Sequence, residues 1–193
     1  MPRAGNQPES LPFEDLPLEP VVARGLEAMG YSTATPIQTR VIEPMLDGRD
    51  VIGLAPTGTG KTLAYGIPLA QRMLLEPPPL LRRARRHKGD DQGGQYVDPR
   101  RRLRGLVVVP TRELASQVAS ELRTLTKGSL IKVGAVWGKA ALKPQREKIE
   151  AGLDFLAGTP GRLRELMDID VLSLAFVRHL VVDEGDRMLD MGF

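Results

Sequence analysis

The chain has 193 residues, 41% hydrophobic and 26% charged, which is enough for one domain with a packed core and too little for two ordinary ones. No apolar stretch approaches the roughly 20 residues that cross a bilayer, and the absence of cysteine excludes disulfides, thiolate metal sites and a cysteine nucleophile. The net charge of +3 is mild, but it is unevenly distributed along the chain.

A leader and two helices are predicted at the amino end. Residues 1–11 lack the apolar core of a secretory signal and are expected to be a disordered leader, followed by one folded domain over 12–193. Helices are expected over 19–29 and 36–47, because each amphipathic run ends at a glycine and the second begins with a threonine and a proline. The lack of cysteine and of a targeting signal fits an intracellular, cytoplasmic protein.

A strand, a glycine-rich turn and a helix are predicted next. Residues 51–55 form a short apolar run, residues 61–75 a helical pattern, and the turn between them ends in Gly60-Lys61-Thr62. In such turns backbone N–H groups surround phosphate oxygens, the lysine reaches the outer phosphates, and the threonine hydroxyl is available to Mg²⁺. This segment therefore predicts a site for nucleotide phosphate.

A basic insertion is predicted over 77–104. It carries nine Lys or Arg residues against three Asp residues, and it shows neither helical nor strand periodicity. The rest of the chain is slightly acidic, so the positive net charge comes from this segment. Two interpretations stay open, a solvated loop and a flexible arm for nucleic-acid phosphates.

The remaining sequence alternates short apolar runs with amphipathic segments. Strands are expected over 106–109, 131–137, 154–157 and 179–182, and helices over 112–126, 144–151 and 162–167. The strands are apolar throughout, which is typical of parallel sheets that helices cover on both faces. The sequence therefore predicts a three-layer α/β fold with a mostly parallel sheet.

An acidic pair, Asp183 and Glu184, follows the last predicted strand. The carboxyl ends of the strands are where open α/β sheets bind ligands. One carboxylate can hold the water shell of Mg²⁺ while the other orients an attacking water. A charged turn is the ordinary explanation for such a pair, but the phosphate loop upstream favours a catalytic site.

Several motifs in one order resemble the DEAD-box family of ATP-dependent RNA helicases, over nearly all of the chain outside the leader and insertion. These are Phe13 with Gly30-Tyr31 and Thr35-Pro36-Ile37-Gln38 for the Q motif, and residues 55–62, 110–115, 159–162 and 183–186 for motifs I, Ia, Ib and II. The resemblance implies a RecA-like P-loop fold, ATP and Mg²⁺ as cofactors, and single-stranded or duplex-end RNA as a partner bound without sequence preference.

The resemblance also implies roles for individual residues. Gln38 would hydrogen-bond adenine and Phe13 would pack against it, and the nucleotide-binding set would be Phe13, Tyr31, Gln38, Thr57, Gly58, Thr59, Gly60, Lys61 and Thr62. Thr62 and Asp183 would hold Mg²⁺, and the catalytic residues would be Glu184, Lys61 and Asp183. RNA would contact Pro110, Thr111, Arg112, Gly138, Thr159, Pro160 and Arg162. Thr111 as a simple helix cap and Phe13 as an ordinary apolar anchor stay open.

Two residues depart from the family pattern. Gly185 stands where motif II usually has alanine, and Lys139 stands where the family commonly has a second glycine. Gly185 adds backbone freedom beside the acidic pair, and Lys139 either loosens or adds an RNA contact. Trp137 carries no motif, and core packing or surface exposure explains it.

Three functions fit the sequence, and the motifs favour the amino-terminal RecA-like domain of a DEAD-box RNA helicase. The chain ends at Phe193, before the family's Ser-Ala-Thr motif and its second RecA-like domain, so the resemblance implies that this chain alone lacks helicase activity. It also implies an empty position in the sheet between strands at Val51 and Val181. The alternatives are a naturally short ATP- and RNA-binding module without turnover and, less favoured, another P-loop ATPase or kinase.

Overall fold

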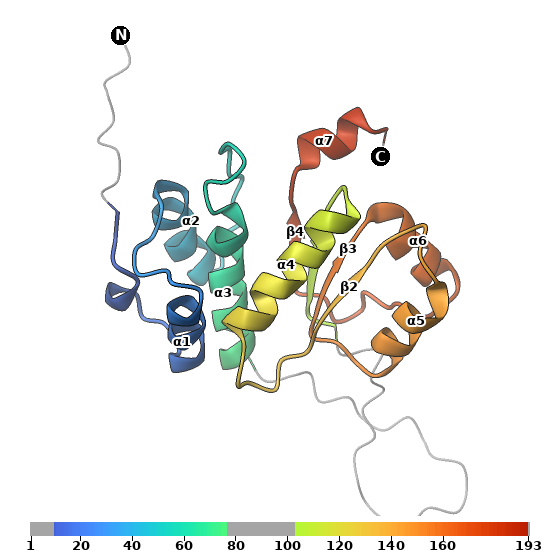
Figure 1. Cartoon of the computed structure of the whole chain (residues 1–193), viewed down its shortest axis with the longest axis horizontal. Helices are drawn as coiled ribbons and strands as arrows, with labels where there is room; N and C mark the ends of the chain where they lie inside the picture. Colours follow the sequence, from blue (N-terminus) through green and yellow to red (C-terminus); the bar gives the residue numbers. More distant parts are fainter. Residues whose placement is uncertain (1–9, 77–102, 193) are drawn as a thin grey trace, which may run out of the picture. The chain divides into compact units, whose positions relative to one another are not determined.

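The computed structural model describes residues 10–76 and 103–192 (Figure 1). Residues 1–9 of the predicted leader over 1–11, residues 77–102 of the predicted insertion over 77–104, and Phe193 lie outside the described residues. The chain divides into two units, Met1–Glu76 with Ser120–Leu130 and Pro77–Ala119 with Ile131–Phe193, here named the helical unit and the sheet unit. Within the described ranges, no helix combines the length and the apolar character that crossing a membrane requires.

The helical unit contains the short 3-10 helix η1 (Phe13–Asp15) and the helices α1 (Pro20–Ala28), α2 (Pro36–Leu46) and α3 (Lys61–Leu75), together with the end of α4 (Arg112–Leu125). The helices predicted in these ranges are confirmed. Gly30 and Gly48 have φ of 78° and 80°, a left-handed conformation that glycine adopts at low cost, and each stops the helix before it.

One apolar cluster holds the helical unit together. Its members come from η1, α1, α2, α3 and the end of α4, and they are Phe13, Val22, Leu26, Ala34, Ile42, Leu63, Ile67, Ala70 and Leu125. Gln71 of α3 adds polar contacts, because its amide accepts a hydrogen bond from Glu19 N at 2.7 Å and donates one to Pro17 O at 2.9 Å. The segment that leads into α1 is therefore fixed to α3.

The sheet unit contains four parallel strands, β1 (Gly105–Val108), β2 (Val133–Val136), β3 (Phe155–Gly158) and β4 (His179–Val182), in the order β2-β3-β1-β4. Its helices are the start of α4, α5 (Leu142–Glu150), α6 (Pro160–Asp168) and α7 (Gly185–Asp190). Apolar side chains of α5 and α6 pack with those of the strands, in a cluster that includes Ile149, Leu163, Leu166, Leu106, Val136 and Leu156. The α/β class with a parallel sheet is confirmed.

The predicted strand over 51–55 is wrong. These residues form no strand, and Ile52 and Leu54 are 94% and 93% exposed. A strand needs a backbone partner, and the four described strands all belong to the sheet unit, whereas residues 51–55 belong to the helical unit. The apolar run over 51–55 therefore has the composition of a strand, but no strand in the described residues pairs with it.

The prediction that every strand is covered on both faces fails at β4. Leu180 and Val182 are 63% and 57% exposed, whereas β1, β2 and β3 are nearly fully buried. In the described sheet β4 pairs with β1 on one side and forms an edge on the other.

Arg104, which the sequence places in the basic insertion, lies instead in the interior of the sheet unit. Its guanidinium forms an ion pair with Asp154 at 3.1 Å, and the two side chains are 4% and 0% exposed. Asp154 also accepts a hydrogen bond from Lys132 N at 2.9 Å, and the Arg104 carbonyl accepts one from His179 N at 3.1 Å. The pair therefore joins the residues at which all four strands begin.

Candidate functional site

The phosphate loop connects residue 55 to the start of α3. Gly58 and Gly60 have φ of 79° and 88°, a conformation that glycine reaches without strain, and Lys61 is the first residue of the helix. Lys61 Nζ donates a hydrogen bond to Ala55 O at 2.9 Å, and Thr59 Oγ1 donates one to Pro56 O at 2.8 Å. The lysine, the following Thr62 hydroxyl and the amino end of a 15-residue helix are thus collected at one loop, an arrangement suited to anions.

The start of α2 holds this loop in place. Gln38 is 3% exposed, and its amide accepts a hydrogen bond from Thr35 N at 2.9 Å and donates one to Gly60 O at 3.0 Å. Thr35 Oγ1 donates a further hydrogen bond to Thr59 O at 2.9 Å. A Cβ atom at Gly60 would displace the Gln38 amide, so glycine there preserves the contact with Gln38 as well as allowing the positive φ. The predicted Q motif and phosphate loop are therefore in direct contact.

The other predicted nucleotide residues differ in exposure. Phe13 is 6% exposed and belongs to the apolar cluster of the helical unit, which is the ordinary anchor role that the sequence leaves open. Tyr31 is 51% exposed, Thr57 and Gly58 are exposed, and Thr62 is half-buried. All lie in the helical unit with the phosphate loop.

The acidic pair lies between β4 and α7 in the sheet unit. Asp183 is 8% exposed, and its Oδ1 accepts a hydrogen bond from Glu184 N at 3.0 Å. Glu184 has a φ of 52°, and its Oε2 forms an ion pair with Arg187 at 3.2 Å. A left-handed conformation costs a non-glycine residue about 1–3 kcal/mol and is concentrated at functional sites. The outlier therefore supports a functional role for Glu184.

Gly185, the departure from the family pattern in motif II, does not have a positive φ. A Cβ atom there would meet Val182 Cγ1 at 3.4 Å, an ordinary van der Waals distance. The backbone therefore does not require glycine at this position, and an alanine would fit.

The chemistry of the predicted Mg²⁺ ligands fits a metal that arrives with a nucleotide. Among the described residues no three His, Cys, Asp or Glu side chains gather into a metal cluster. Mg²⁺ keeps several waters and is usually bound by one or two carboxylates together with substrate phosphates, rather than by a cage of protein ligands. Thr62 offers a hydroxyl in the helical unit and Asp183 a buried carboxylate in the sheet unit, and each is a ligand type of that kind.

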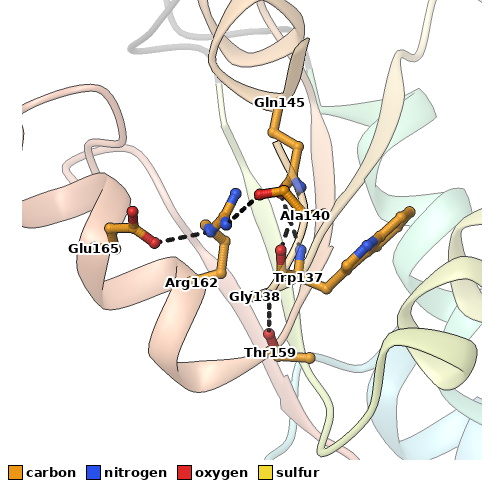
Figure 2. Close-up of polar contacts among 7 residues, drawn as sticks. All are labelled: Trp137, Gly138, Ala140, Gln145, Thr159, Arg162 and Glu165. Carbon is orange, nitrogen blue, oxygen red and sulfur yellow. Dashed lines mark hydrogen bonds and ion pairs between the residues drawn. The ribbon is translucent and has the colours of Figure 1, made fainter. Parts of the chain in front are cut away.

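Four of the predicted RNA residues, Arg112, Gly138, Thr159 and Arg162, lie in or contact the loop 137–140, named here the β2–α5 loop; Figure 2 shows the last three. Gly138 N donates to Thr159 Oγ1 at 3.4 Å, and the Arg112 guanidinium lies over the Trp137 ring, 5.3 Å from its centroid. Arg162 is 5% exposed, donates a hydrogen bond to Ala140 O at 2.8 Å, and pairs with Glu165 at 2.9 Å. Motifs Ia and Ib thus both contact this loop.

The other residues of motifs Ia and Ib have structural positions. Thr111 Oγ1 accepts a hydrogen bond from Leu114 N at 3.2 Å, which is the helix cap that the sequence leaves open for it. Pro110 is buried before α4, and Pro160 is the first residue of α6. Arg112 is the exposed cation of this group.

Gln145 is the residue that the sequence analysis misses. It is 6% exposed in α5, accepts a hydrogen bond from Trp137 N at 3.0 Å and donates one to Trp137 O at 3.2 Å (Figure 2). Trp137, for which the sequence indicates only core packing or surface exposure, is therefore held by hydrogen bonds between Gln145 and its backbone and by Arg112 over its ring. A single glutamine in a helix rich in charged residues gives no sequence signal for this role.

Known proteins resemble this chain over nearly its whole length. A family model described as DEAD/DEAH box helicase matches residues 35–193. The chain is 34% identical over 181 residues to "ATP-dependent RNA helicase RhlB" of Pseudoalteromonas atlantica, which covers 94% of this chain and 38% of that protein. It is 42% identical over 163 residues to "DEAD-box ATP-dependent RNA helicase 5" of Arabidopsis thaliana, covering 84% of this chain and 28% of that protein. The chain spans less than half the length of these curated relatives.

Solved structures share the fold. A hypothetical ATP-dependent RNA helicase from Sulfolobus tokodaii superposes with a TM-score of 0.73 and 31% identity, covering 91% of this chain and 44% of that one. A DEAD box protein from the hyperthermophile Methanococcus jannaschii gives a TM-score of 0.74 and 28% identity, covering 94% of this chain and 44% of that one. Since the family model also matches well over half of the sequence, the chain belongs to the DEAD/DEAH box helicase family.

Proposed function

We propose that this chain binds ATP with Mg²⁺ and the backbone of single-stranded RNA, as the amino-terminal RecA-like part of an ATP-dependent RNA helicase. The observation that carries the proposal is the direct contact of Gln38 with Gly60, because it couples the start of α2 to a loop built for phosphate. Membership of the helicase family and the names of the relatives support the same function.

In the proposed ATP site, Lys61 and the first N–H groups of α3 bind the outer phosphates. Gln38 retains capacity for adenine, because an amide oxygen accepts two hydrogen bonds and an amide nitrogen donates two, and each atom makes one of these bonds to Thr35 or Gly60. Thr62 and Asp183 would hold the magnesium, which when bound would neutralise charge on the phosphates. Glu184 orients the water that attacks the outer phosphate.

RNA is proposed to contact the exposed surface beside the β2–α5 loop, where Arg112, Gly138 and Thr159 lie. A guanidinium, a backbone N–H group and a hydroxyl bind phosphate and sugar without reading bases. Arg162 is included through the loop that it holds, since its own guanidinium is buried and bonded to Ala140 O. We also propose that hydrolysis is coupled to unwinding only with a second RecA-like domain.

Replacing Lys61 with alanine tests the ATP site. The variant loses the one side-chain cation of the phosphate loop, so we expect its affinity for a fluorescent adenine nucleotide to fall by at least about tenfold, the effect of losing one charge-assisted hydrogen bond of about 1.5–3 kcal/mol. Titration of the nucleotide by fluorescence anisotropy measures the loss. Lys127→Ala removes an exposed lysine from the same unit and serves as the matched control. Equal nucleotide affinities for the two variants would contradict the proposed site.

Replacing Gln38 with glutamate separates its two contacts. A carboxylate still accepts the hydrogen bond from Thr35 N, but it cannot donate to Gly60 O and repels that carbonyl. We expect weaker ATP binding and a smaller preference for ATP over GTP, measured by competition against the fluorescent nucleotide. An unchanged ratio of the two affinities would remove Gln38 from base recognition.

A further inference from the structure

We propose that Lys139 is an additional RNA contact that neutralises one backbone phosphate, and that Gln145 and Arg162 are positioning residues that hold it in place. The inference rests on the RNA binding proposed above and adds residues to that site. Lys139 stands at the tip of the β2–α5 loop, between Gly138 and Ala140, and its side chain is exposed.

The backbone of Lys139 is held in an unfavourable conformation. Its φ is 57°, in the left-handed region that costs a residue with a Cβ atom about 1–3 kcal/mol and that glycine would adopt freely. Such a conformation persists only when the surrounding structure determines it. The conformation of Lys139 is therefore set by its surroundings rather than by the preference of lysine.

The surroundings of the loop do determine its shape. Gln145 bonds both the N–H and the carbonyl of Trp137, Thr159 accepts from Gly138 N, and Arg162 donates to Ala140 O (Figure 2). These contacts fix the backbone of the residues immediately before and immediately after Lys139. Gln145 and Arg162 are 6% and 5% exposed, so neither can itself present its polar group to RNA.

The charges around the loop suit a phosphate. Lys139 forms no ion pair with any residue in the described ranges, so its ammonium group is not neutralised there. The Arg112 guanidinium lies over the ring of Trp137, two residues before Lys139, and the Thr159 hydroxyl lies beside Gly138. Two cations and a hydroxyl presented at one loop provide the groups that commonly bind the sugar-phosphate backbone.

The test compares Lys139→Gln with Lys148→Gln, which removes another exposed lysine of the same unit at the far end of α5. The measurement is the affinity of the 193-residue chain for a fluorescent oligo-U single strand over a range of salt concentrations. We expect Lys139→Gln to reduce the slope of log affinity against log salt by about 0.7, the value for one phosphate contact on single strands. Lys148→Gln is expected to leave the slope unchanged.

The positioning role of Gln145 is tested by combining its substitution with that of Lys139. Gln145→Glu keeps the acceptor for Trp137 N and loses the donor to Trp137 O, so we expect it to lower the salt slope in the parent chain. In the Lys139→Gln background the same change is expected to have little further effect, whereas a merely structural role would give equal losses in both backgrounds. Lys139→Gly, which removes both charge and strain, is expected to bind RNA weakly while melting at or above the parent temperature.

The outcomes separate this inference from the proposed function. A parent chain that binds oligo-U with equal salt slopes for Lys139→Gln and Lys148→Gln would overturn the role of Lys139 and leave RNA binding intact. Additive losses for Gln145→Glu and Lys139→Gln would overturn the positioning role. A parent chain with no measurable affinity for RNA, but with intact nucleotide binding, would overturn both the inference and the RNA-binding part of the proposed function.

Discussion

Replacing Asp154 with alanine is expected to lower the free energy of unfolding by about 3–5 kcal/mol, the cost of breaking a buried ion pair by removing one of its members. The Arg104 guanidinium would stay in the interior, because the backbone N–H of the same residue donates to Asp154 O before β3 and its carbonyl accepts from His179 N of β4. Lys132 N would also lose its acceptor. Native proteins are stable by only about 5–15 kcal/mol, so this one substitution can remove most of the stability of the chain.

The matched control is Asp168→Ala, which breaks another Arg–Asp pair of the same unit. Arg164 and Asp168 are 3.8 Å apart, and their side chains are 82% and 67% exposed, so water and salt already screen their attraction. We expect a change within about 0.5 kcal/mol. Urea denaturation monitored by circular dichroism measures both values, and a small loss for Asp154→Ala would show that the buried pair is dispensable.

The helices could be predicted from the sequence with little error, because their signals are local. Proline and glycine mark their ends, and apolar residues at helical spacing mark their buried faces. α3 begins and ends at the predicted residues, 61 and 75, and α2 differs by one residue at its end. α5 begins two residues earlier than predicted and α7 is not predicted at all, since neither start carries a strong cap.

The strand over 51–55 and the position of Arg104 could not be predicted, because both depend on distant partners. An apolar run becomes a strand only when another strand pairs with it, and no such partner is described for 51–55. Arg104 follows a run of arginines, and only its pairing with Asp154, 50 residues away, distinguishes it from them. Sequence periodicity contains no information on either contact.

One part of the candidate site could be predicted from the sequence, and another part could not. The loop that ends in Lys61 and the acidic pair carry recognisable motifs, since phosphate and Mg²⁺ constrain which residue types can bind them. The hydrogen bonds of Gln145 to Trp137 and of Gln38 to Gly60 connect side chains of one segment to backbone atoms of another. A side chain that bonds a backbone group places no demand on the partner's identity, so such contacts leave no pattern in a single sequence.

Replacing Gly25 with alanine is the second change expected to have a large effect. Helix propensity alone predicts a gain, because alanine is more favourable than glycine by about 1 kcal/mol in a helix interior. The structure predicts a loss, because a Cβ atom at Gly25 would lie 2.6 Å from Leu125 Cα and 2.7 Å from Leu125 O. Both atoms belong to the backbone, so no rotamer change can relieve the collision.

The loss should reach or exceed about 3 kcal/mol, the upper end of the usual cost of overpacking, since α1 must separate from the end of α4. Leu26 and Leu125, each nearly inaccessible to solvent, would lose contacts in the apolar cluster as the helices part. Gly161→Ala is the control, because that glycine is also helical, its φ is not positive, and no atom lies within 4 Å of the added Cβ. Thermal melts should therefore shift down strongly for Gly25→Ala and stay level or rise for Gly161→Ala. Equal shifts would mean that propensity, rather than the close approach of the two backbones, decides the residue at position 25.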